Sequence, residues 1–313
     1  MSGVHVIKKE TLIRRFLKDL KHNWILYVMI LPVLIYYVIF AYWPMYGITL
    51  AFKDYNVKLG ILGSPWIGLE NFKRFFSAYN FKNLLKNTLG ISLYSFFVGF
   101  PIPIVFALLL NYLTNMRLKK VVQMISYAPH FISTVVICSM IQMFCSPDTG
   151  AFNILRNLVG LESVSFLSKP EWFKSIYVWT GVWQGMGWSA IIYISALAGV
   201  DYEMHEAAII DGATKIQRMR YIDIPSIAPT IIMLMILDIG GLMSVGFEKV
   251  YLLKNDLNSP ASSIISTYVY EIGLLKAEYG YSTAVGLFNT IVNVILLVSA
   301  NTFSKKILHE SMF

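Results

Sequence analysis

Long stretches without charge alternate with short polar segments along this chain. A helix that crosses the hydrocarbon core of a bilayer needs about 20 mainly apolar residues. One such stretch, 224–247, contains Asp238 as its only charged residue. The other five contain no charged residue at all: 24–52, 87–116, 121–146, 175–200 and 280–304. The pattern predicts an all-α polytopic membrane protein with a six-span transmembrane domain over residues 24–304.

The composition agrees with this class and indicates an orientation. Of the 313 residues, 56% are hydrophobic and only 14% are charged, whereas soluble domains carry about a quarter charged residues. The net charge of +8 comes from Lys and Arg that flank apolar stretches, which favours membrane topology over nucleic-acid binding. By the positive-inside rule, the tails 1–23 and 305–313 and the loop 201–225 lie in the cytoplasm. The longer loops then face outward: 48–83, 147–174 and 248–279.

The N-terminal tail contains the amphipathic segment "TLIRRFLKDLKH", residues 11–22. Its apolar side chains share one helical face and its basic side chains lie opposite. This pattern is typical of a helix lying along the inner membrane surface. A simple basic anchor for the first span is an equally good interpretation.

Signatures of catalysis or of a bound cofactor are missing from the sequence. No G-x-x-x-x-G-K-[ST] phosphate loop occurs, so we do not expect this chain to hydrolyse nucleotide itself. The five histidines are scattered, without metal-ligand spacing. Cys138 and Cys145 lie seven residues apart, about 10 Å along a helix, which is too far for a disulfide. We expect no enzyme activity, no metal and no cofactor on this chain.

Polar side chains inside the spans are few. Asp238 is the one carboxylate in the middle of a predicted span, where a charge costs about 2.5–3.5 kcal/mol on insertion scales. It either lies on a solute path or pairs with a neighbouring polar group. Gln184, Asn289 and Asn293 are further candidates for the path, and the two asparagines share a face of the last span. Gly181 and Gly185 form a small-xxx-small pair that predicts close helix packing.

The segment "HEAAIIDGATKIQRMRYIDIP", residues 205–225, is a polar insert between two apolar stretches. Asp201 is placed to cap a short helix, and Gly212 permits the left-handed backbone that ends one. Pro225 would fall near the first turn of the next span, where its missing N–H is harmless. The segment is longer than a connector requires. It is interpreted as a docking element for another protein, and the alternative is an ordinary amphipathic loop.

This loop also resembles a known signature. The pattern E-A-A, D-G-A and I-x-[LI]-P is similar to the loop of the membrane-spanning subunits of ATP-binding-cassette importers. The positions that match are Glu206, Ala207, Ala208, Asp211, Gly212, Ala213, Ile222, Ile224 and Pro225. Ile224 stands where leucine is usual, and Met219 where an aromatic residue is common. A second segment, "WIGLENFKRFF" at 66–76, resembles the outward loop of maltose-permease-like carbohydrate importers, and "LGILGSPWIGLENF" is closest to the subgroup for complex oligosaccharides.

The resemblance implies a type I ABC importer permease fold in a bacterial cell membrane. The loop would then be a coupling helix, in which Glu206 makes a polar contact, Ala207 and Ala208 allow a close fit, and Gly212 sets the bend. The implied partners are a pair of cytoplasmic ATPase subunits that use ATP and Mg²⁺, a second related permease subunit, and an extracytoplasmic solute-binding protein. Transport would proceed by alternating access, with an oligosaccharide as the expected cargo.

Three rival functions remain open at this point. A secondary transporter driven by an ion gradient would need more intramembrane carboxylates or histidines, and usually an internal repeat. A permease of the same kind could carry a solute other than a sugar. A receptor or structural membrane protein would have no transport role.

Overall fold

The computed structural model describes residues 18–307. The predicted amphipathic helix over 11–22 therefore lies mostly outside the described residues, and only 18–22 are seen to be helical. Within the described part, β-structure is limited to one antiparallel bridge between Lys53 and Trp66. The all-α fold class predicted from the sequence is confirmed.

The first half of the chain forms a series of helices joined by short turns. In order these are α2 (Trp24–Tyr37), a π turn (Val38–Tyr42), α3 (Trp43–Met45), a 3₁₀ turn (Tyr46–Phe52), α4 (Gly60–Gly63), α5 (Glu70–Ser77), α6 (Phe81–Gly99), α7 (Pro101–Asn111), α8 (Met116–Tyr127), a 3₁₀ turn (Ala128–Phe131), α9 (Thr134–Phe144) and α10 (Ala151–Leu158).

The second half contains the longest helices. It comprises a 3₁₀ turn (Phe166–Ser168), α11 (Pro170–Leu197), α12 (Tyr202–Ile210), α13 (Lys215–Arg218), a π turn (Met219–Asp223), α14 (Ile224–Gly240), α15 (Phe247–Leu253), α16 (Ser259–Ser262), α17 (Ile265–Tyr270), a π turn (Glu271–Leu275) and α18 (Tyr279–Ile307).

Four continuous helical segments of the described chain are long and apolar enough to cross a membrane: Trp24–Phe52, Phe81–Asn111, Lys215–Gly240 and Tyr279–Lys306. They correspond to four of the six predicted spans.

The two remaining predicted spans differ from simple apolar helices. Over the stretch predicted as 121–146, the chain bends by 99° between Phe131 and Thr134, so it is not one straight helix. Pro129, just before the bend, removes a backbone donor, which favours a break there. The other predicted span corresponds to α11, which has 28 residues but is less apolar than the four segments above. The count of six spans stays a prediction.

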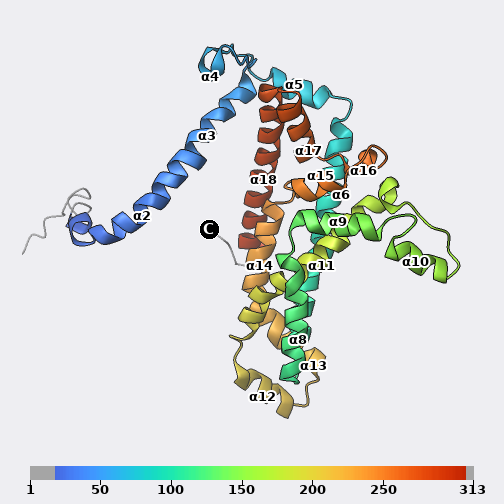
Figure 1. Ribbon diagram of the computed structural model, residues 1–313. Coiled ribbons are helices and arrows are strands. Elements are labelled where there is room, and N and C mark those ends of the chain that lie inside the picture. Colours follow the sequence, from blue (N-terminus) through green and yellow to red (C-terminus); the bar gives the residue numbers. More distant parts are fainter. Residues whose placement is uncertain (1–17, 308–313) are drawn as a thin grey trace, which may run out of the picture.

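Helix α11 runs through the middle of the bundle and packs against α6, α7, α8 and α14 (Figure 1). One close approach to a neighbour is at Gly187, where an added Cβ would lie 2.3 Å from the Ser126 carbonyl oxygen on α8. The prediction that Gly181 and Gly185 pack closely against a neighbouring helix is wrong within this chain. Gly185 has no atom within 4 Å of its Cβ position, and Gly181 meets only the end of the Lys249 side chain.

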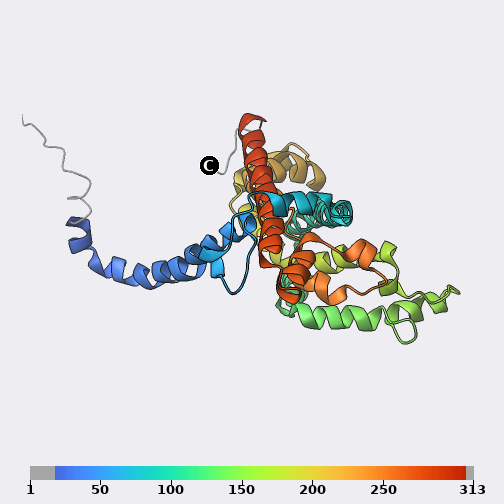
Figure 2. The same cartoon turned by 90° about the horizontal axis from the view of Figure 1, so that it is seen from above.

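The N-terminal helix stands apart from the rest of the chain. Seen from above, α2 runs outward from the bundle rather than along it (Figure 2). None of its residues is buried, although its side chains are almost all apolar. Its exposed face must therefore lie against lipid or against another membrane protein.

The segment "WIGLENF" stabilises the end of the bundle near α5 and α17. The Asn71 amide donates to the carbonyl oxygens of Ala51 at 3.0 Å and Lys53 at 3.2 Å, and its side chain is buried. The Lys53 ammonium lies 5.0 Å from the centre of the Trp66 ring. This segment therefore closes the loop that follows the first apolar helix.

Candidate docking loop and solute path

The polar loop forms a capped helix, α12, at the end of the bundle opposite α5 and α17 (Figure 1). The Asp201 carboxylate accepts a hydrogen bond from Glu203 N at 3.0 Å, as an N-cap does. Gly212 has a φ of 78°, and Ala213 N donates to Ala208 O at 2.8 Å. The helix thus ends in a left-handed glycine. The Asp201 cap and the Gly212 bend are both confirmed.

The loop presents polar and apolar side chains to its surroundings. Glu206, Ala207 and Asp211 are exposed, whereas Ala208 and Ala213 are half-buried. Large apolar side chains of the loop are also exposed, by 48–85%: Tyr202, Met204, Ile209, Ile210 and Ile216. Gathered exposed apolar groups outside a bilayer mark a protein interaction surface.

After Gly212 the chain enters the membrane as one unbroken helix. Thr214 and Gln217 form a capping box at the start of α13. The helix then continues without a break from Lys215 to Gly240, with Pro225 in the first turn of α14. The π turn directly before Pro225 provides the wider spacing that a proline ring requires.

Beneath the loop lies a cluster of four polar side chains. The Asp223 side chain is completely buried, and its Oδ2 accepts a hydrogen bond of 2.7 Å from the Tyr112 hydroxyl. Its Oδ1 lies 3.2 Å from His205 Nε2. The Arg218 guanidinium lies 5.4 Å from the centre of the Tyr112 ring. Burial and the hydrogen bond to Asp223 raise the pKa of the Tyr112 hydroxyl, which therefore stays protonated as a donor.

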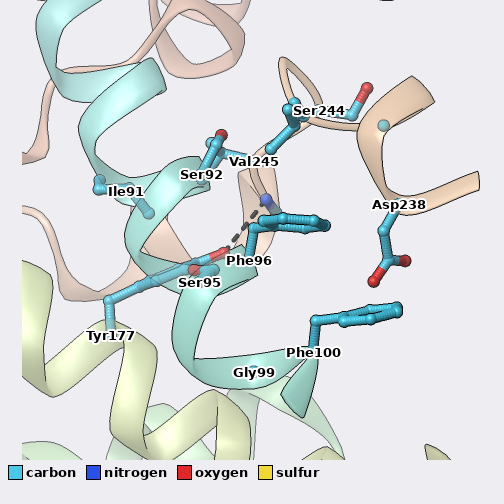
Figure 3. A pocket seen from close by; sticks show the side chains of 13 residues that line it. Ile91, Ser92, Ser95, Phe96, Gly99, Phe100, Tyr177, Asp238, Ser244 and Val245 are labelled. Atoms are coloured by element: carbon cyan, nitrogen blue, oxygen red, sulfur yellow. Dashed lines mark hydrogen bonds between the residues drawn. The ribbon is translucent and has the colours of Figure 1, made fainter. Parts of the chain in front are cut away.

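Midway along the bundle, α6, α11, α14 and the segment after α14 line an open cavity of about 310 Å³ (Figure 3). The Asp238 carboxylate points toward the ring of Phe100, which stacks on Phe96 at 5.5 Å. Tyr177 reaches the cavity from α11, and its hydroxyl accepts a hydrogen bond of 3.2 Å from Gly246 N. Aromatic faces beside hydroxyl and carboxylate groups suit a carbohydrate, because sugars combine apolar faces with hydroxyls.

A second cavity of about 290 Å³ shares Ser95, Gly99 and Tyr177 with the first. Gln184 lines it, and the Gln184 amide also donates to Ile132 O at 3.2 Å. Lys249 lines it as well. In the sequence, Lys249 follows Glu248 and looks like an ordinary loop charge; only its burial in the fold distinguishes it.

The two asparagines of α18 do not line either cavity. Asn293 accepts a hydrogen bond from Met243 N at 2.9 Å and donates one to Ser244 Oγ at 2.9 Å. It thereby supports the segment after α14, which contributes Ser244 to the first cavity. The Asn289 Oδ1 atom is buried without a hydrogen-bond partner in the described structure. Of the four predicted path residues, Asp238 and Gln184 therefore line adjoining cavities, whereas Asn289 and Asn293 line neither.

Both cysteines are free and buried, as expected from their spacing. Across residues 18–307, no group of three or more His, Cys, Asp or Glu side chains is arranged to hold a metal ion.

A helical bundle with apolar segments of membrane-spanning length, a cavity and a capped polar loop at one end is the architecture expected of a membrane transport component. Residues 92–309 match the family described as "Binding-protein-dependent transport system inner membrane component", and the chain belongs to that family. The family consists of membrane components of transporters, so the chain is a permease and not itself an enzyme.

Two relatives and one solved structure resemble the chain over most of its length. Protein LplB of Bacillus subtilis is 43% identical, over 94% of this chain and 92% of its own. The polygalacturonan/rhamnogalacturonan transport system permease protein YteP of the same organism is 42% identical, over 98% and 96%. A chain from a bacterial ABC transporter that imports the acidic polysaccharide alginate is 39% identical, with a TM-score of 0.87, over 94% of this chain and 99% of its own. The similarity confirms the ABC importer permease fold.

Proposed function

We propose that this chain is one permease subunit of an ATP-driven, binding-protein-dependent importer of oligosaccharides in a bacterial cell membrane, with both termini in the cytoplasm. A pair of cytoplasmic ATPase subunits binds and hydrolyses ATP with Mg²⁺. Their movement reaches the spans through loop 201–225, and the cavity lined by Asp238 opens alternately to the two sides.

One observation carries this proposal: the docking helix α12 is exposed on its outer face and is a regular helix with defined ends. The Asp201 cap and the Gly212 bend fix its length, and Ile210 is 85% exposed at its end. Rigid elements that switch between two positions are what coupling between distant sites requires. A segment without helical structure would deform under a push instead of transmitting it.

The second permease subunit is supported by two exposed features of this chain. Asp238 lies two residues before the end of α14, at the cavity midway along the bundle, and is exposed in the isolated subunit. A carboxylate at that depth requires a polar partner or a watery cavity. The unburied face of α2 offers a further surface for the same subunit. We propose a heterodimer whose interface closes the cavity.

The cargo is proposed to be an oligosaccharide that carries carboxylates. YteP is named for polygalacturonan and rhamnogalacturonan, whose galacturonate units carry carboxylates, and the solved transporter imports the acidic polysaccharide alginate. A second structure of an alginate transporter is a complex with a periplasmic protein bound to an alginate pentasaccharide. The Lys249 ammonium in the second cavity is a fitting partner for a sugar carboxylate. As in that complex, a binding protein would deliver the sugar to the outward loops of this chain.

Co-purification tests the assembly, and reconstitution tests the transport mode. A tagged chain should recover an ATPase and a related permease from the native membrane. Liposomes with the complete complex should accumulate an acidic oligosaccharide only with binding protein and ATP. Uptake by this chain alone, down a proton or sodium gradient, would favour the secondary-transporter alternative instead.

A further inference from the structure

Asp223 joins three separate elements of the cytoplasmic end of the bundle. It belongs to the π turn before α14, and its two oxygens face different neighbours. Tyr112 follows the last residue of α7, and His205 lies on α12. The distances are 2.7 Å from the Tyr112 hydroxyl to Oδ2 and 3.2 Å from His205 Nε2 to Oδ1.

A fully buried carboxylate keeps such partners because the alternative is costly. Removing one partner of a buried pair leaves a charge without compensation, which is strongly destabilising. Here Oδ1 accepts no hydrogen bond in the described structure, and its 3.2 Å contact with His205 Nε2 is an ion pair only when the imidazole is protonated. Displacing α12 without α7 and α14 would therefore break the contact. The three elements therefore meet at this one carboxylate.

The covalent connection between α12 and α14 cannot do this alone. It passes through Gly212, which has a φ of 78° and no atom within 4 Å of its Cβ position. An unpacked glycine bend is a compliant link, since glycine has wide conformational freedom. A direct side-chain contact across the bend bypasses this link.

The connected helices are the ones that reach the cavities. Asp238 lies 15 residues beyond Asp223 on the same helix, which is about 22 Å along its axis. Pro103 of α7 lines the second cavity. A displacement of α12 passed to Asp223 and Tyr112 is thus passed to both cavity walls.

We infer that Tyr112, His205 and Asp223 form the joint that transmits movement of the docking helix to α7 and α14. They act as positioning residues for coupling and touch neither the cargo nor the ATPase. This inference rests on the proposed function, because it assigns the route by which docking at loop 201–225 reaches the solute path.

The test uses the complete reconstituted importer and three variants: His205→Ala, Asp223→Asn and Tyr112→Phe. Each is compared with wild type for ATPase attachment, ATP hydrolysis and the number of sugar molecules imported per ATP hydrolysed. Tyr112→Phe removes a single hydroxyl from a half-buried residue, so it remains informative if Asp223→Asn does not fold. His205→Gln keeps a donor nitrogen near Asp223 and serves as the conservative control.

The expected result is retained ATPase attachment and hydrolysis, with sugar imported per ATP reduced about two- to thirtyfold, the range typical of mutations along a coupling route. His205→Gln should recover most of the loss. Unchanged sugar per ATP in the variants would overturn the inference, and so would loss of ATPase attachment, since the cluster would then only shape the docking surface. If wild type attaches no ATPase, the proposed function fails instead.

Discussion

The ammonium group of Lys249 lies 3.0 Å from the carbonyl oxygen of Tyr177 and 4.9 Å from the centre of the same residue's ring. Lys249 is 8% exposed, and none of the ion pairs among residues 18–307 includes it. Its charge is therefore balanced only by neutral groups, at the wall of a cavity. A carboxylate of the proposed cargo would supply the anionic contact that these residues do not.

Lys249 makes the cargo proposal testable. Lys249→Met should lower uptake of an oligogalacturonate about 10- to 100-fold, which corresponds to the 1.5–3 kcal/mol of a charged hydrogen bond. Uptake of the methyl-esterified, uncharged form should change much less. The ratio of the two rates is the measurement, and Lys249→Arg should keep it close to wild type. Equal losses for both sugars would assign Lys249 to folding alone.

Close packing at Gly187 predicts a stability difference between two neighbouring glycines. Gly187→Ala should lower the free energy of unfolding by about 1–3 kcal/mol, because the methyl group meets the backbone of Ser126. Gly185→Ala is the matched control, since its Cβ position is open and alanine favours helix. Thermal unfolding of the two variants in detergent checks the prediction. An equally stable Gly187→Ala would contradict the packing described for α11 and α8.

The bend at Gly212 predicts a graded series of substitutions. With a φ of 78°, Gly212→Ala is strained by about 1–2 kcal/mol although the space is open. Gly212→Asn should be milder, because asparagine tolerates the left-handed region, and Gly212→Pro should abolish uptake while the protein still inserts. Solute uptake at equal membrane abundance is the readout. Uptake should decrease in the order Gly, Asn, Ala, Pro at position 212. Any other order would show that transport does not require the left-handed backbone there.

Asp238 distinguishes a solute path from a purely structural polar group. Asp238→Asn keeps the shape and removes the charge, so the structural role should survive. If the carboxylate contacts cargo, solute-stimulated ATP hydrolysis by the assembled complex should fall, while basal hydrolysis is preserved. An unchanged response to solute would leave Asp238 as a packing residue.

The sequence was sufficient to predict features that depend only on residues close together in the chain. Charge-free stretches follow from the thickness of the bilayer, and the N-cap at Asp201 and the bend at Gly212 follow from side-chain chemistry and glycine geometry. The match to the coupling-loop signature then indicated the family. These predictions needed no knowledge of which helices are neighbours.

Features that depend on packing between distant segments were missed. Gly187 and Gly185 look alike in the sequence, and only the approach of α8 separates them. Asn293 resembled a path residue, whereas its amide holds Met243 and Ser244. The contact between Asp223 and Tyr112 joins residues 111 positions apart, so no sequence spacing indicates it.

Glu206→Lys offers the most direct test of the central claim that α12 couples a separate ATPase to these spans. Glu206 is exposed on the docking helix, so the substitution should leave insertion and assembly with the second permease intact. The measurement is ATP-dependent uptake of an acidic oligosaccharide by the complete importer in liposomes. The account predicts that uptake is lost while the chain remains in the membrane at wild-type abundance. Wild-type uptake by the Glu206→Lys importer would contradict it.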